Sequence, residues 1–194
     1  MALFAAAVIL PLLRQPGVRM WETVWVEDGP IYVQQANSAA VTSTIFQGYA
    51  GYLQLIVRLL AVPTAFLPIA WIAAYLALVS ALVCALGAAF VYRSTAGWIA
   101  TWPIRLVVAG MVVLGPTVAI ETTATITNTI WTMLAIAPWA FISVRDERRD
   151  VALRAVVAFF VATATVLSAL FFPLAVGVAI ARRTRASITV AAAF

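Results

Sequence analysis

The 194-residue chain is 65% hydrophobic and only 10% charged, and its net charge is +5. Such a composition is typical of an integral membrane protein and excludes an ordinary soluble domain. All twelve basic residues are arginines, and most lie in short segments between apolar runs. Basic residues in such segments set the orientation of a protein in the bilayer. We therefore expect the lipid bilayer, and no nucleic acid, as a partner.

Histidine is absent from the chain. Its absence excludes a histidine-ligated metal site as well as the Ser-His-Asp and Cys-His mechanisms. The single cysteine, Cys84, lies inside an apolar run and can form no intrachain disulfide. We expect it to fill space in a helix rather than to react.

The first 65 residues are expected to form the end of one membrane span, followed by a long loop. Residues 1–13 are apolar but too short to cross about 30 Å of hydrocarbon, so we interpret them as the end of a first span. Residues 14–65 are mixed in character. Within them, one polar stripe of an amphipathic helix is predicted by the spacing of Gln47, Gly51, Gln54 and Arg58. Such a helix suits the membrane interface.

The rest of the chain is mainly apolar. Transmembrane helices are predicted at 66–92, 104–120 and 129–144. Segment 155–181 has arginines on both flanks, and basic flanks favour the cytoplasmic side. We therefore predict a short helical hairpin there, reversing near 168–173, with a single long span as the alternative. Residues 188–194 predict the start of a truncated span, so we expect the chain to be part of a longer protein.

The arginine-rich segment 145–154 is the strongest cytoplasmic signal. Counting spans back from it places both the 14–65 loop and the polar segment 121–128 on the external face. The predicted fold is all-α, a polytopic transmembrane helix bundle with a long external first loop containing interfacial amphipathic helices. It forms a single transmembrane domain, and the expected location is the plasma membrane as a multi-pass protein.

Two adjacent carboxylates, Glu27 and Asp28, stand in the external loop before Gly29-Pro30. In a glycosyl transfer, one carboxylate can take the proton of an acceptor hydroxyl and another can hold a divalent cation on a phosphate leaving group. The pair is equally typical of a solvated loop in which Asp28 starts a turn. The sequence leaves both interpretations open.

A second polar group begins at Glu121. A single polar stripe on a helix is predicted by the spacing of Glu121, Thr125, Asn128 and Thr132. A carboxylate at that depth is costly unless it is paired or faces water, which indicates function. Hydrogen bonds between packed helices would explain the threonines and the asparagine equally well. Trp131 lies beside the stripe and could stack on a sugar or anchor the helix at the interface.

Arg58 is the remaining charged residue of interest. Its guanidinium could bind a phosphate through two parallel hydrogen bonds. The alternatives are contact with lipid headgroups or a salt bridge to Glu27, Asp28 or Glu121.

The order of these features resembles the GT-C superfamily of integral-membrane glycosyltransferases, which use polyprenyl-phosphate-linked sugars. Members have a first span, a long external loop with an acidic motif and interfacial helices, and many further spans. The resemblance rests on WVEDGPIYVQQA, on GYAGYLQLIVRLLA and on the pattern E-x6-N-x2-W that begins at Glu121. The same segments are also similar to uncharacterised bacterial multi-span proteins.

This resemblance implies transfer of a sugar from a polyprenyl-phosphate donor at the external face of a bacterial inner membrane. Asp28 would be the catalytic base, with Glu27 assisting it or ligating a divalent cation. Arg58, with Gln54 beside it, would bind the lipid phosphate. The sugar or acceptor pocket would be lined by Glu121, Asn128 and Trp131.

Two other functions remain open. A transporter or lipid flippase would use Arg58 and Glu121 along a pathway without making a bond. The break predicted at Gly115-Pro116 favours it, whereas the lack of an internal repeat does not. A non-catalytic membrane subunit would use the same acids only to contact a partner.

Overall fold

The computed structural model describes residues 1–14, 17, 19–25, 27–38, 40–115, 125–142 and 145–194. Every regular element in these ranges is a helix. The closest approach to strand pairing within them is an isolated bridge between Tyr49 and Tyr52, which closes a turn. The predicted all-α class is therefore confirmed.

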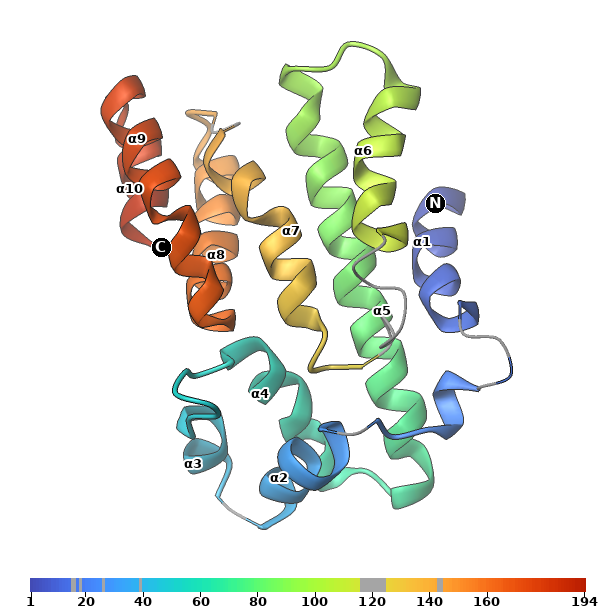
Figure 1. The fold of residues 1–194 in the computed structure, drawn as a ribbon. Coiled ribbons are helices and arrows are strands. Elements are labelled where there is room, and N and C mark those ends of the chain that lie inside the picture. The colour runs from blue at the N-terminus through green and yellow to red at the C-terminus, as the bar shows by residue number, and fades with distance from the viewer. Residues whose placement is uncertain (15–16, 18, 26, 39, 116–124, 143–144) are drawn as a thin grey trace.

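Seven helices form a bundle, and they run roughly along one another in Figure 1. They are α1 (Ala2–Leu13), α5 (Ile69–Ser94), α6 (Trp102–Leu114), α7 (Thr129–Ile142), α8 (Arg148–Ala164), α9 (Phe172–Arg182) and α10 (Arg185–Ala192). Several of them are apolar all round, as is typical of helices surrounded by other apolar groups. Each helix pairs its backbone amides and carbonyls through internal hydrogen bonds. An apolar chain of this composition can therefore satisfy its backbone without strands.

Helix α5 is the central element of the bundle and packs against α1, α6 and α7. Gly87 lies where α5 and α7 meet, because a Cβ there would approach Thr132 Cγ2 to 2.9 Å. The Cys84 thiol is buried and lies 3.5 Å from the Val112 carbonyl of α6. Arg14 joins α1 to α6 by donating to the carbonyls at the end of α6, Val113 among them at 3.2 Å.

Among the described residues, one helix is long and apolar enough to cross a membrane. It covers 69–97 and has a mean hydropathy of 2.4. The other apolar helices are shorter, and α6 and α7 are separated by residues 116–124, which lie outside the described ranges. The expected spans at 104–120 and 129–144 therefore correspond in part to helices α6 and α7.

The segment 155–181 holds the end of α8, the 3-10 helix η6 (Val166–Phe171) and nearly all of α9. Thr165 between α8 and η6 is extended, with φ −160° and ψ 155°, and its side chain accepts from the Leu167 amide. Pro173 lies in the first turn of α9, where its missing N–H costs no hydrogen bond. Residues 188–194, expected to start a span, lie in α10 and the two residues after it.

The loop predicted at 14–65 folds into short helices at one end of the bundle, shown in blue to teal in Figure 1. We call residues 19–66 the cap. Its elements are η1 (Met20–Glu22), η2 (Asp28–Val33), α2 (Gln34–Ser38), α3 (Val41–Phe46), α4 (Leu55–Ala61) and η3 (Val62–Phe66). Contacts of α4 with α5, α7 and α8 join the cap to the bundle.

The polar stripe predicted over Gln47 to Arg58 is wrong as a single helix. Helix α4 begins only at Leu55. The preceding residues turn sharply, because Ala50, Gly51 and Gln54 have φ values of 52°, 88° and 51°. Left-handed residues interrupt a right-handed helix, and a glycine allows such a turn at low cost.

Candidate functional site

The candidate site begins at η2, a π-helical turn that directly follows Glu27. Turns of this kind are rare and frequently occur at functional sites. Within η2, Asp28 and Tyr32 both face inward and are 2% and 0% exposed. The turn therefore brings one carboxyl and one phenol from the same short segment into the interior of the protein.

The Asp28 carboxylate holds the turn that precedes α7. Its Oδ2 accepts from the Ile126 amide at 3.0 Å, and its Oδ1 accepts from the Thr127 amide at 3.1 Å and the Thr127 hydroxyl at 2.6 Å. Burial raises the pKa of Asp28 above its ordinary value, more than these three hydrogen bonds lower it. Asp28 thus joins the cap to a segment almost one hundred residues later in the chain.

Glu27 has a different environment from its neighbour. Its side chain is half-buried, and Oε1 accepts a hydrogen bond from the Tyr49 hydroxyl at 3.2 Å. Tyr49 in turn packs edge-on against Tyr32, with ring centroids 5.8 Å apart. Glu27 is therefore the more accessible of the two carboxylates and is oriented by a single tyrosine.

Arg58 of α4 is fully buried in the same part of the cap. Its guanidinium lies over the Tyr32 ring, 5.1 Å from the centroid, and Nη1 donates to Gln35 Oε1. Among the described residues, nothing accepts a hydrogen bond from its Nε or Nη2. Burial lowers the pKa of Arg58, yet a guanidinium stays charged in proteins. Arg58 thus presents a buried positive charge with two unused donor atoms.

Gln54 lies next to this guanidinium and is 1% exposed. Its side-chain oxygen accepts a hydrogen bond from the Tyr32 hydroxyl, and its carbonyl accepts the Arg58 amide at 3.1 Å. The left-handed backbone at Gln54 turns the chain into α4 and thereby sets the position of Arg58. We call the group formed by Glu27, Tyr32, Gln35, Tyr49, Gln54 and Arg58 the cap cluster.

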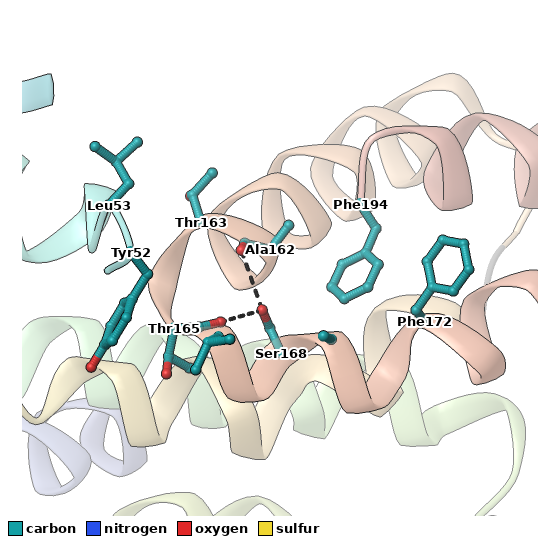
Figure 2. Close-up of a pocket in the computed structure, with 10 residues that line it drawn as sticks. Tyr52, Leu53, Ala162, Thr163, Thr165, Ser168, Phe172 and Phe194 are labelled. Atoms are coloured by element: carbon teal, nitrogen blue, oxygen red, sulfur yellow. Dashed lines mark hydrogen bonds between the residues drawn. The ribbon is translucent and has the colours of Figure 1, made fainter. Parts of the chain in front are cut away.

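A cavity of about 430 Å³ opens beside the cap, between the turn at Tyr52–Leu53 and the reversal from α8 to α9 (Figure 2). Most of its lining is apolar, with Leu53, Phe172 and Phe194 among the side chains. The Ser168 hydroxyl on its wall lies 2.5 Å from the Thr165 carbonyl. Tyr52 and Leu53 immediately precede Gln54, so one turn contributes residues to both the cavity and the cap cluster.

The described residues of the second predicted stripe do not lie on one helix. Thr125 and Asn128 precede α7, and the Asn128 amide donates to Thr125 Oγ1 at 3.2 Å. Asn128 directly follows the turn that Asp28 holds, whereas Trp131 lies on α7 and is 44% exposed. The expectation for Glu121 falls outside the described residues. A continuous helical stripe through Thr125 and Asn128 is therefore wrong.

Candidate metal ligands are few in the described part of the chain. No group of three or more histidine, cysteine, aspartate or glutamate side chains gathers there. A divalent cation at this site would be held by Glu27 and by oxygens of the substrate, because Glu27 is the accessible carboxylate and Asp28 is buried.

Three contributors were not predicted from the sequence. Tyr32 lies near the end of the π-helical turn and Gln35 lies three residues later in α2, and both contact Arg58. Thr127 is identified only by its contact with Asp28. The available signal was the short polar run after Gly29-Pro30, which contains Gln35.

Comparison with known proteins adds no name to this geometry. No family model, curated protein or solved structure matches the chain.

Proposed function

We propose that the chain belongs to a multi-pass membrane protein whose cap lies at the external face. The composition supports this placement, as do large apolar side chains on the outside of the bundle. Ile69, Val107 and Met111 are 88%, 67% and 63% exposed. In water such a surface would associate or aggregate, whereas lipid tails cover it at no cost.

Within this membrane protein, we propose that the cap cluster transfers a sugar from a polyprenyl-phosphate donor to a hydroxyl acceptor. The observation that carries the proposal is the buried Arg58, two of whose donor atoms have no acceptor in the described part of the chain. A phosphate oxyanion is the ligand that a guanidinium binds best through paired hydrogen bonds. A half-buried carboxylate, Glu27, belongs to the same cluster and could accept a proton.

Two members of the cap cluster, Glu27 and Arg58, act directly in the proposed reaction. The acceptor oxygen attacks the anomeric carbon, and the bond from that carbon to the phosphate oxygen breaks. The acceptor proton passes to Glu27, and the bonding pair leaves on the polyprenyl phosphate, whose charge Arg58 stabilises. Because phosphate is a competent leaving group, positioning and deprotonation supply most of the rate enhancement.

In the interpretation from sequence, Asp28 is the catalytic base and Glu27 assists it. The hydrogen bonds of Asp28 favour different roles, in which Asp28 positions the turn before α7 and Glu27 takes the proton. Asn128 and Trp131 then follow that turn on the side of the sugar or acceptor. The apolar cavity beside Tyr52 suits part of the hydrocarbon of the lipid carrier.

The test is a transfer assay with the full chain reconstituted in lipid, a radiolabelled polyprenyl-phosphate sugar and a hydroxyl acceptor. Glu27→Gln should lower turnover at least about 100-fold, the usual range for a general base. Glu22→Gln is the matched control, because Glu22 lies in the same cap but is exposed and pairs with the exposed Arg19. Its turnover should be unchanged.

The other outcomes separate the alternatives. Full activity of Glu27→Gln together with an inactive, folded Asp28→Asn would return the role of base to Asp28. Passage of the labelled lipid across the bilayer with its covalent structure intact, and no transfer, would favour a transporter or flippase. Wild-type activity in both variants would reject the roles given to the two carboxylates. Absence of transfer by the wild-type chain would reject the enzyme proposal and leave a non-catalytic subunit.

A further inference from the structure

The arginines are distributed unevenly between the two ends of the bundle. Nine of the twelve occur where α5 and α9 end and where α6, α8 and α10 begin. They are Arg93, Arg105, Arg145, Arg148, Arg149, Arg154, Arg182, Arg183 and Arg185. Among the described residues, three acids occur at this end, namely Asp146, Glu147 and Asp150. The opposite half of the described chain holds three arginines and three acids, so the excess positive charge is concentrated at one end.

The tertiary structure gathers these arginines from separate segments. Arg93 at the end of α5 approaches Asp150 of α8 to 3.9 Å. Arg182 at the end of α9 donates to the Ile142 carbonyl at the end of α7, at 2.8 Å. The ends of α5, α7 and α9 and the starts of α8 and α10 therefore meet at the upper end of the view in Figure 1.

Seven of the nine side chains are exposed there, and we call them the arginine rim. They are Arg93, Arg145, Arg148, Arg149, Arg182, Arg183 and Arg185. Arg154 does not belong to the rim because it is buried against Asp150. Asp150 is buried and paired with Arg154 and Arg93, so among the described residues the exposed acids at this end are Asp146 and Glu147, against seven arginines of the rim.

Apolar side chains surround the rim. Trp98, between α5 and α6, and Trp102, the first residue of α6, are 63% and 59% exposed, and Val156 of α8 and Ile180 of α9 are also exposed. Tryptophan in such a position is typical of the boundary between hydrocarbon and headgroups. A charged rim bordered by exposed tryptophan and aliphatic groups is suited to a lipid surface rather than to a soluble polyanion.

We propose that the arginine rim binds the phosphodiester headgroups of anionic phospholipids. Guanidinium groups pair with phosphate oxygens, and clusters of four to eight basic residues at a membrane surface select anionic lipid. The inference rests on the membrane placement proposed above but not on the sugar transfer, because the rim and the cap cluster lie at opposite ends of the bundle.

The experiment measures lipid selection by the full chain. The protein is reconstituted in nanodiscs of phosphatidylcholine mixed with phosphatidylglycerol, and the lipids that remain bound after extraction are quantified by mass spectrometry. We expect roughly tenfold enrichment of phosphatidylglycerol at low ionic strength and less at high salt, because salt screens exposed charges. No enrichment in the wild-type protein would overturn the proposal.

Two sets of variants test the rim itself. Arg148→Gln, Arg149→Gln and Arg185→Gln combined should abolish the enrichment. Asp146→Asn with Glu147→Gln should increase it, because this change removes two acids from the same end. Arg19→Gln, at the opposite end, should leave it unchanged. Unaltered enrichment in the triple variant would refute the assignment, and if that variant does not fold, Arg148→Gln alone replaces it.

The outcomes also separate this proposal from the proposed function. A triple variant that still transfers sugar but has lost lipid selection supports the rim as a separate surface. A wild-type protein that inserts in the bilayer without lipid preference rejects the rim alone. Binding of single-stranded RNA by the solubilised wild-type chain, without lipid preference, would assign the rim to nucleic acid instead.

Discussion

Two buried arginines, one near each end of the molecule, have opposite surroundings. Arg154 of α8 donates from Nε to Asp150 at 2.5 Å, from Nη1 to the Trp139 carbonyl at 2.5 Å, and from Nη2 to the Ser94 hydroxyl at 3.2 Å. Arg58 of α4 has no carboxylate within salt-bridge distance among the described residues and uses one nitrogen, towards Gln35. Both lie near an aromatic ring.

The difference shows which of the two is structural. A buried ion whose hydrogen bonds are all made holds helices together, and here Arg154 connects α8 with the ends of α5 and α7. A buried ion with unused donors costs stability, so its retention needs another reason. For Arg58, binding of an anionic group is the reason that the geometry supports.

The largest effect on stability is expected from Arg154→Met. This change removes the closest partner of the buried Asp150, leaving Arg93 at 3.9 Å, and should lower the free energy of unfolding by about 3–5 kcal/mol. Denaturant titration of the full chain in detergent measures the loss. The control is Arg149→Met on the same helix, which is exposed and should change stability by less than about 0.5 kcal/mol. Equal stability of the two variants would contradict a structural role for Arg154.

Asp28→Asn should have the next largest effect. Both carboxylate oxygens accept hydrogen bonds, whereas an amide offers only one acceptor and leaves a buried N–H unpaired. The expected loss is about 1–3 kcal/mol. Asp146→Asn, an exposed control, should show none. Hydrogen exchange of the Ile126 and Thr127 amides should increase in Asp28→Asn, and unchanged exchange would refute the assigned contacts.

The Asp28 carboxyl should also make the free energy of unfolding depend on pH. Because burial raises its pKa above the ordinary 3.8, the folded protein holds this proton more tightly than the unfolded chain does. Its contribution to stability is therefore greatest below that ordinary value and is lost as pH rises through the raised pKa. Asp28→Asn should flatten this part of the stability profile. An identical profile in the variant would assign the dependence to another group.

Tyr49→Phe should have a smaller effect. It removes the hydrogen bond to Glu27, which should cost about 1 kcal/mol. Because Tyr49 orients the Glu27 carboxylate, turnover in the transfer assay should also fall. Unchanged stability and turnover would contradict a role for this hydrogen bond.

Arg58→Met should have the smallest effect on unfolding. Removing a buried charge that has unused donors should leave the free energy of unfolding within about 1 kcal/mol of wild type or increase it. Binding of polyprenyl phosphate, measured by calorimetry in detergent, should nevertheless be lost. Destabilisation as large as that of Arg154→Met would show that Arg58 has a structural role and would remove the contrast between the two ends.

Some features follow from the sequence because they depend on composition and short spacing. Apolar runs rich in alanine, leucine and valine require internally hydrogen-bonded elements, and the structure is all-helical where it is described. Charged residues are rare in this chain, so Glu27, Asp28 and Arg58 could be selected as candidates without coordinates.

Other features required tertiary contacts. The helical stripe predicted through Arg58 fails because the backbone turns at Gly51 and Gln54. The donors that Asp28 accepts come from Ile126 and Thr127, and no local pattern indicates a contact over that separation. The sequence by itself determined the helical class and the chemistry available in the cap. Only the tertiary structure determined which charged side chains find hydrogen-bond partners, because those partners are distant in sequence.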